Sequence, residues 1–290
     1  MKKLTLLFLI GNSLSFYSQM IKDLKFETVV PEAENNYVAV PRDKAEDGYG
    51  FGYIYFDSLG GYTYKVIGTL KEENGKLKVI ESYDQKVGYQ IQRINNLGFK
   101  SAIIPDSMLK KLGYSKEPEW LKSYKTNDSE NEKIEERASV LNGANYPNFA
   151  LPMLEKLHKN GDKSKKLYFE LMFSYNALNK FAEAEKMGNE AFKNAVEDDL
   201  IRKEYLFSLA YQKKIDSAEV YLNKNLSKFT NVDNRMEVLI NMTAICANEN
   251  KLNLANKWLE ILKSQTEAGK YQKNINILDK IIKEKQSKIQ

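Results

Sequence analysis

The sequence predicts an α+β fold, in which a small antiparallel β-meander domain precedes an all-α solenoid of helical hairpins. Two patterns carry this prediction. Residues 62–70 alternate with period two, which is typical of a half-buried strand. Further on, Ala150, Ala184 and Ala218 are separated by 34 residues each, and Ala255 follows after 37. A fixed period of this size indicates stacked repeats. A length of 290 residues suits two domains.

Residues 1–18 have the pattern of a signal peptide. Lys2 and Lys3 are followed by the apolar run 4–10 and by the small residues of 11–15. The run is well short of the ~20 residues that span a bilayer. We therefore expect cleavage after Ser15 or Ser18, no transmembrane span in the mature protein, and a periplasmic or secreted location. The two lysines and the segment 16–19 resemble exported proteins of the Bacteroidetes group.

Residues 19–125 are expected to form the β domain. Strands are predicted at 52–56, 62–70, 77–81, 88–94 and 99–104, with an Asn-Gly hairpin turn at Asn74-Gly75. A further strand over 37–40, ended by Pro41, would form an edge. Tight turns favour a meander over crossover connections. Two short helices, one from Pro105 to Gly113 and one starting at Pro118, would close the domain.

This domain is rich in tyrosine, and two interpretations stay open. Tyrosines are ordinary strand formers that pack in a core, but they also suit a stacking platform for sugars. The eight residues are Tyr37, Tyr49, Tyr53, Tyr55, Tyr62, Tyr64, Tyr83 and Tyr89. The glycine-rich segment 48–53 does not fit a phosphate-binding loop, because Tyr53 replaces the third glycine and a strand follows instead of a helix.

A polar linker over 123–130 separates the two domains, and Ser129 with Glu132 predicts a capping box that starts a helix. Four helical repeats are expected over 129–269. The segment 270–290 carries apolar residues at Ile275, Leu278, Ile281 and Ile282 among lysines, which predicts one amphipathic helix. Such a helix would cap the array; the alternative is docking onto anionic lipid.

The period and residue types resemble tetratricopeptide repeats (TPR). The second repeat carries the pattern best, with Leu171, Met172, Tyr175, Ala184 and Ala191. The small residues suit close crossing of antiparallel helices. The other repeats match in part, through Ala138, Leu141, Ala150, Leu154 and Leu157 in the first, Phe207, Ser208, Tyr211 and Ala218 in the third, and Leu239, Thr243, Cys246, Ala255, Leu259 and Leu262 in the fourth.

Several departures mark the array as divergent. Pro152 falls inside the second helix of the first repeat, and Gly188 stands where the family carries an aromatic residue. On this alignment the third repeat has a turn over 212–217 that is two residues short, and an insertion near 230–234 delays the fourth.

The resemblance implies a non-catalytic scaffold that binds a protein or peptide partner of the bacterial cell envelope in a groove lined by the first helix of each repeat. Matched position by position, the groove residues would be Phe169, Phe173, Asn176, Arg202, Tyr205, Ile240 and Asn248. This aromatic, nearly uncharged set suits an apolar peptide. On this alignment, replacing Phe173 and Tyr205 by alanine is expected to abolish capture of the partner.

Composition argues against several other functions. One cysteine, Cys246, excludes an internal disulfide, and its apolar neighbours predict burial. One histidine, His158, is too few for a zinc site and is expected to cap a helix C-terminus. The net charge of +5, or +3 without Lys2 and Lys3, is too small to argue for nucleic acid. We therefore expect no catalytic residues, no cofactor and no metal.

The alternative is a periplasmic glycan-binding protein or hydrolase that uses the tyrosine-rich domain. A glycosidase needs two carboxylates across one cleft. The candidates are Asp47, Asp57, Glu72, Glu73, Glu81 and Asp84, and nothing in the sequence pairs them.

Overall fold

The computed structural model describes residue 21 and residues 24–44, 47–73, 76–84, 86, 88–124 and 129–288. The chain divides into two compact units, Met1–Val140 and Leu141–Gln290. The division falls inside one helix, α4 (Glu130–Gly143), whereas the sequence placed the linker just before that helix. The expected signal peptide, the Asn74-Gly75 turn and residues 125–128 of the linker lie outside the described residues.

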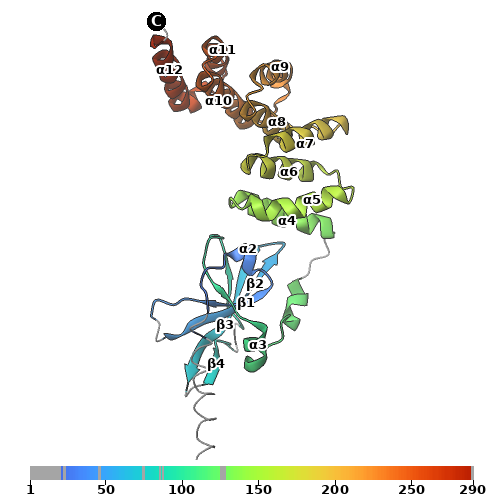
Figure 1. The fold of residues 1–290 in the computed structure, drawn as a ribbon, viewed down its shortest axis with the longest axis vertical. Helices are drawn as coiled ribbons and strands as arrows, with labels where there is room; N and C mark the ends of the chain where they lie inside the picture. Colours follow the sequence, from blue (N-terminus) through green and yellow to red (C-terminus); the bar gives the residue numbers. More distant parts are fainter. Residues whose placement is uncertain are drawn as a thin grey trace, which may run out of the picture. The chain divides into compact units, whose positions relative to one another are not determined.

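A six-stranded antiparallel sheet forms the first unit (Figure 1). Four strands follow one another as a meander, and the sheet order is β4-β3-β2-β1-β6, with β5 pairing the other end of β3. The strands are β1 (Asn36–Val40), β2 (Tyr49–Asp57), β3 (Gly61–Glu73), β4 (Lys76–Glu81), β5 (Ile91–Arg93) and β6 (Ala102–Ile103).

The sheet differs from the expected one in two ways. Strand β1 is not at an edge, because it pairs with β2 on one side and with β6 on the other. Strand β5 does not extend the meander beyond β4, because it pairs with residues 63–65 of β3 while β4 pairs with residues 68–73. Strand β3 is 13 residues long and therefore has room for both partners. Local sequence periodicity predicts neither the pairing of β6 with β1 nor that of β5 with β3.

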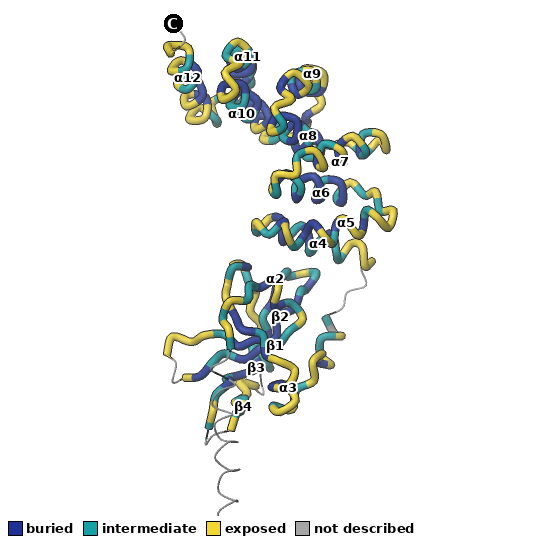
Figure 2. Tube along the Cα trace, viewed as in Figure 1, coloured by how far each residue is buried: buried dark blue, intermediate teal, exposed yellow. Residues whose placement is uncertain are grey.

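Aromatic packing covers one face of this sheet. The two predicted closing helices are present as α3 (Asp106–Leu112) and the 3₁₀ helix η2 (Glu119–Tyr124), and a short helix, α2 (Val30–Ala33), precedes β1. Gly113 ends α3 in the left-handed conformation, with φ of 80°. Trp120 of η2 packs edge-on against Tyr53 and Tyr55, at centroid distances of 5.6 and 5.5 Å. Within the first unit, Figure 2 shows buried residues in the central strands, and β1, β2 and β3 all contain them.

The second unit continues an array of antiparallel helical hairpins that α4 begins. Figure 1 shows α5 to α12 following one another along this array. The first helices of the hairpins are α4, α6 (Lys165–Ala177), α8 (Asp199–Tyr211) and α10 (Val232–Asn248). The second helices are α5 (Pro147–Lys159), α7 (Phe181–Lys193), α9 (Ile215–Asn225) and α11 (Leu252–Lys263), and α12 (Gln272–Ser287) ends the array. Two 3₁₀ helices, η3 (Leu226–Lys228) and η4 (Ala268–Tyr271), lie between helices.

Every hairpin closes through the same three-residue turn, over 144–146, 178–180, 212–214 and 249–251. The middle residue of each turn is left-handed, with φ between 56° and 65°: Asn145, Asn179, Lys213 and Asn250. The next N–H donates to the carbonyl five residues earlier, at 2.8–3.0 Å. The predicted short turn in the third repeat is therefore wrong. The sequence alignment of the third repeat places residues 207, 208 and 211 two positions too far along the chain, because the aromatic side chains of Phe207 and Tyr211 imitate the family pattern.

The alanines mark where the two helices of a hairpin cross. Ala150, Ala184, Ala218 and Ala255 are each the fourth residue of a second helix and are fully buried. The longer step to Ala255 arises because α10 has 17 residues, against 13 in α6 and α8. Its extra turn begins in the segment where the sequence placed an insertion. Pro152 lies in the second turn of α5, where it removes one backbone hydrogen bond.

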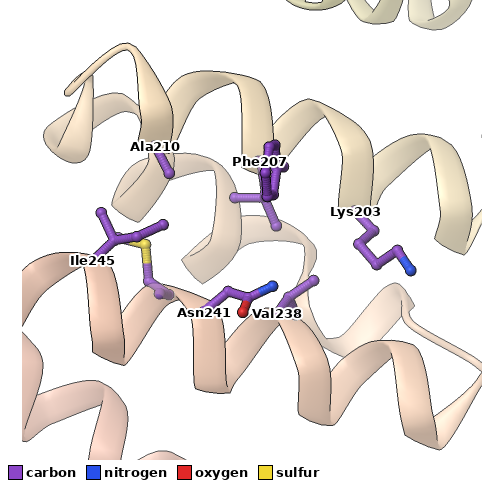
Figure 3. Close-up of a pocket in the computed structure, with 8 residues that line it drawn as sticks. Lys203, Phe207, Ala210, Val238, Asn241 and Ile245 are labelled. Carbon is purple, nitrogen blue, oxygen red and sulfur yellow. The ribbon is translucent and has the colours of Figure 1, made fainter. Parts of the chain in front are cut away.

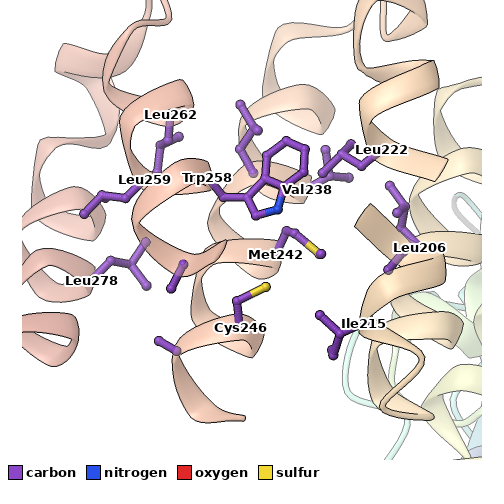
Figure 4. Close-up of a cluster of buried hydrophobic side chains, with 14 of the residues drawn as sticks. Leu206, Ile215, Leu222, Val238, Met242, Cys246, Trp258, Leu259, Leu262 and Leu278 are labelled. Carbon is purple, nitrogen blue, oxygen red and sulfur yellow. The ribbon is translucent and has the colours of Figure 1, made fainter. Parts of the chain in front are cut away.

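The last hairpins and α12 share one apolar core (Figure 4). Trp258 of α11 is fully buried at its centre, and Cys246 is also fully buried. Burial raises the pKa of the Cys246 thiol to about 11, as expected for an inert structural cysteine. Ile275, Leu278 and Ile282 of α12 face this core. In the described part of the chain, each helix is too short or too polar to span a membrane.

Candidate functional site

A row of partly exposed residues runs along the first helices of the second unit. In α6 it consists of Phe169 and Phe173, and the 34-residue step gives Lys203 and Phe207 in α8. In α10 the 37-residue step gives Ile240 and Ala244. We call these six residues the first-helix face. The two members on each helix are four residues apart and so share one side of that helix. Because α6 contacts α8 and α8 contacts α10, the three pairs lie on neighbouring helices.

Three of the predicted groove residues belong to this face, and a fourth lies at its end. Phe169, Phe173 and Ile240 are partly exposed, and the two phenyl rings contact each other at 6.2 Å between centroids. Asn248 is exposed at the last residue of α10, where its carbonyl oxygen accepts a hydrogen bond from Lys285 at 3.3 Å. Whether these four residues bind a partner stays a prediction.

Arg202 and Tyr205 do not lie on this face, so the structure places them apart from the other predicted groove residues. Arg202 is buried, with its guanidinium 2.9 Å from Glu197 and 3.3 Å from Asp199. Tyr205 packs against aromatic residues of the second helices, at 5.1 Å from Phe192 and 4.8 Å from Tyr221. The cause is the two-residue misalignment of the third repeat. A strict 34-residue step from Phe169 and Phe173 would have pointed to Lys203 and Phe207.

Asn176 also differs from its prediction, because it is buried between first helices. Its side-chain N–H group donates to Glu204, to the carbonyl oxygen at 3.0 Å and to the carboxylate at 2.9 Å. Asn142 makes the same two bonds to Glu170 one repeat earlier, at 3.2 and 2.7 Å. All four residues are at most 8% exposed. These pairs join successive first helices and are unavailable to a partner in this arrangement.

The equivalent pair is missing between α8 and α10. Ala210 follows Asn176 by 34 residues, and Asn241 follows Glu204 by 37. Without the larger pair, a cavity of about 20 Å³ is left between the two helices. Figure 3 shows Ala210 and Phe207 on α8 facing Asn241 and Ile245 on α10 across this space. Lys203 also lines it, and its ammonium lies 3.0 Å from the carboxylate of Glu237.

Exposed aromatic residues continue the face at one edge. The ring of Phe207 stacks on Tyr211 at 4.2 Å, and Tyr211 stacks on Phe181 of α7 at 5.3 Å. Tyr211 is 51% exposed, so part of this cluster is open to solvent. Stacked rings of this kind offer a large rigid contact area at low entropic cost, which suits them to binding surfaces.

The tyrosine-rich sheet offers less surface than a sugar platform would need. Tyr37, Tyr53, Tyr55 and Tyr62 are at most 3% exposed and belong to the core. Burial raises the pKa of Tyr37 and of Tyr53 to about 12, as expected when a phenol is withdrawn from water. Of the eight tyrosines that suggested a platform, only Tyr83 counts as exposed.

Among the candidate carboxylates, four have structural partners, including Asp84, which accepts a hydrogen bond from the backbone N–H of Lys86 at 2.7 Å. Asp57 pairs with Arg93 at 2.7 Å, and Glu73 pairs with Lys71 at 3.1 Å. Glu81 accepts hydrogen bonds from two tyrosine hydroxyls, at 2.7 and 2.9 Å. These contacts stabilise the sheet, and they do not form the facing pair of carboxylates that glycoside hydrolysis requires.

The one histidine takes part in a structural network. His158 lies near the C-terminus of α5, as expected, and its Nε2 lies 2.8 Å from a carboxylate oxygen of Glu190 on α7. The same oxygen accepts a hydrogen bond from Tyr168 at 3.0 Å. Over the residues that the structure describes, no three His, Cys, Asp or Glu side chains are grouped to hold a metal ion.

Comparison with known proteins carries no argument about this chain beyond its own structure. No family model and no curated protein matches the chain. Among solved structures, the chain is similar to YrrB, described as a TPR protein with an unusual peptide-binding site. The two share 16% identity with a TM-score of 0.41, over 59% of this chain and 93% of YrrB. At these values the likeness carries no information about ligands, so the proposals below rest on the residues of this chain.

Proposed function

We propose that this protein is a non-catalytic scaffold that binds a peptide or protein segment along its first-helix face. The observation that carries the proposal is the row of partly exposed residues, five of six of them apolar, on the neighbouring helices α6, α8 and α10. Such a row on rigid helices is suited to an apolar segment laid along it. The single cation in the row, Lys203, is already paired with Glu237, so the contact is apolar in character.

We further propose that the partner belongs to the cell envelope. This proposal rests on the leader-like pattern of residues 1–18, which supports export to the periplasm or beyond. The TPR-like character of the array supports an adaptor role by resemblance to that family.

The test is selection from a phage-displayed library of random twelve-residue peptides on immobilised protein that begins at Gln19. We expect enrichment of peptides with apolar residues. Phe173→Ala with Phe207→Ala should weaken binding of the selected peptides at least 100-fold, since aromatic anchors are each worth roughly 1.5–2 kcal/mol and 1.4 kcal/mol is tenfold. Failure to select any peptide would overturn the proposal.

A matched control removes apolar residues that are exposed elsewhere. Val220 on α9 and Ile277 on α12 are 68% and 50% exposed. Val220→Ala with Ile277→Ala should leave binding unchanged. Far-UV circular dichroism and the melting temperature of each variant verify that it is folded. Equal binding by the aromatic and the control variants would exclude the first-helix face as the site.

A further inference from the structure

The junctions between successive first helices are not equivalent. At two of them a buried asparagine from one helix bonds a buried glutamate from the next, as Asn142 does with Glu170 and Asn176 with Glu204. At the third junction these positions hold Ala210 and Asn241. The interval between the two partners is 28 residues at the first two junctions, and 31 at the third, because the repeat step rises there from 34 to 37 residues.

With Ala210 and Asn241 in place of the asparagine–glutamate pair, the third junction has both empty space and unused hydrogen-bonding capacity. The cavity of about 20 Å³ holds one water molecule or one methyl group. Its walls are mainly apolar, from residues such as Leu206, Val238 and Met242. Within residues 129–288, the side-chain amide of Asn241 makes no hydrogen bond, although it is partly exposed beside the cavity. A free carboxamide offers two donors and an acceptor.

We propose that the junction of α8 and α10 is a selectivity subsite of the peptide site, and that it selects an alanine in the bound segment. The alanine methyl group enters the cavity over Ala210, while the carboxamide of Asn241 accepts from a peptide N–H and donates to a peptide C=O. Phe207, which lines the same cavity, packs beside the alanine. This inference rests on the proposed function, because it specifies the ligand of the same face.

The small volume of the cavity is the reason why the subsite selects alanine. Burying one methyl group contributes only about 0.8 kcal/mol, so the subsite adds little affinity. Larger side chains meet tightly packed walls, and forcing extra carbons into such a space costs roughly 1–3 kcal/mol. The subsite therefore acts mainly by exclusion. The two filled junctions, at Asn142 and Asn176, have no comparable role because their space is already occupied.

The test compares two selections from the same random peptide library. Peptides selected on the unaltered protein should share an alanine at one fixed position, and its replacement by leucine should weaken binding at least tenfold. Ala210→Asn with Asn241→Glu introduces the pair that the fold already contains twice. This variant should bind the alanine peptides at least tenfold more weakly, while far-UV circular dichroism shows that it remains folded.

A control variant places an amide elsewhere. Ala182 is exposed on the second helix α7, so Ala182→Asn should leave binding and alanine preference intact. Val238→Ala widens the cavity and should shift the preferred residue from alanine to valine, which gives a second readout if the double variant loses stability.

The outcomes separate the two proposals. Peptides without a small residue at a fixed position, or unchanged binding by Ala210→Asn with Asn241→Glu, would mean that the cavity holds only water, and the subsite proposal would fall. If the Phe173→Ala, Phe207→Ala variant still lost binding in that case, the first-helix face would stand as the site. Loss of all selection on the unaltered protein would overturn both.

Discussion

Glu204 is a carboxylate that the fold holds away from water between two first helices. Desolvation raises its pKa, and the hydrogen bond from Asn176 offsets only part of this effect. Asn176 itself is incompletely satisfied, since its side-chain oxygen is buried without a partner. One repeat earlier the corresponding oxygen of Asn142 accepts from Ser174 at 2.8 Å. Ser208, the equivalent of Ser174, instead donates to the carbonyl of Tyr205. The second junction is therefore the less well-compensated one.

We predict that Glu204→Gln stabilises the protein in a pH-dependent way. A raised folded-state pKa means that Glu204 favours folding below the ordinary glutamate range, near pH 4, and that this contribution is lost as pH rises through the folded pKa. Glutamine stays neutral at every pH, and its side-chain oxygen can still accept the hydrogen bond from the Asn176 amide. The melting temperature of the variant should therefore match the unaltered protein near pH 4 and exceed it by a few degrees at pH 8.

Glu185→Gln is the matched control with the opposite sign. Burial raises the pKa of Glu185, but hydrogen bonds from Lys214 and Gln212 outweigh it and leave the pKa below the ordinary value. Its stabilising contribution is present above the ordinary glutamate pKa and is lost on acidification. Glu185→Gln should therefore lower the melting temperature at pH 8 and not at low pH. Equal responses of the two variants would show that burial of Glu204 has no energetic consequence.

At the scale of elements, local signals in the sequence were sufficient for much of the array. The capping box formed as predicted, with the Glu132 N–H donating to the hydroxyl of Ser129 and the Ser129 N–H donating to the carboxylate of Glu132. The buried alanines followed from their spacing. The register of the third repeat did not follow from local signals, because Lys213 replaces the asparagine found at the left-handed position of the other three turns. Asparagine adopts this conformation more readily than lysine does.

Gly188 shows how one residue sets the distance between two second-unit helices. The family resemblance places an aromatic residue at this position of α7. Here a Cβ atom would lie 2.5 Å from a ring carbon of Tyr205 on α8 and 3.0 Å from the methyl group of Met172. The ring cannot retreat easily, because Phe192 and Tyr221 pack against it. The aromatic side chain is thus supplied by α8, and glycine makes room for it.

We predict that Gly188→Ala destabilises the protein by roughly 1 kcal/mol. Alanine gains about 1 kcal/mol in helix propensity, but forcing a carbon into a packed site costs about 1–3 kcal/mol. Gly143→Ala is the control, because that helical glycine has open space around its Cβ position and should show only the gain. Urea denaturation measures both. Equal stabilisation by the two substitutions would refute close packing at Gly188.

At the scale of the molecule, each compact unit has its own core. The α+β class and the order of sheet before helices were predictable, since period two and a 34-residue period are visible in the sequence. The pairing of β6 with β1 and of β5 with β3 was not predictable, because each joins strands far apart in the chain. The pairing of β5 also depends on the length of β3. On the first-helix face, the positions of the residues follow from the repeat period, whereas the cavity at Ala210 arises from buried contacts that differ between junctions.

The two tryptophans allow the cores to be followed separately. Trp120 packs against the sheet in the first unit, whereas Trp258 is fully buried in the core of the second. In Trp120→Phe the emission reports the second unit, and in Trp258→Phe it reports the first. Leu259 is 1% exposed beside Trp258, so Leu259→Ala should cost about 2–5 kcal/mol in that core.

We predict that this loss stays within one unit. Added to Trp120→Phe, Leu259→Ala should lower the urea midpoint by about 1 M or more, given a slope of about 2–3 kcal/mol per M. Added to Trp258→Phe, it should leave the Trp120 transition where it was, because no described residue belongs both to the sheet core around Leu70 and to the helical core around Trp258. Leu70→Ala, in the sheet core, should give the mirror result. Equal shifts at both tryptophans would instead show that the chain unfolds as one cooperative unit.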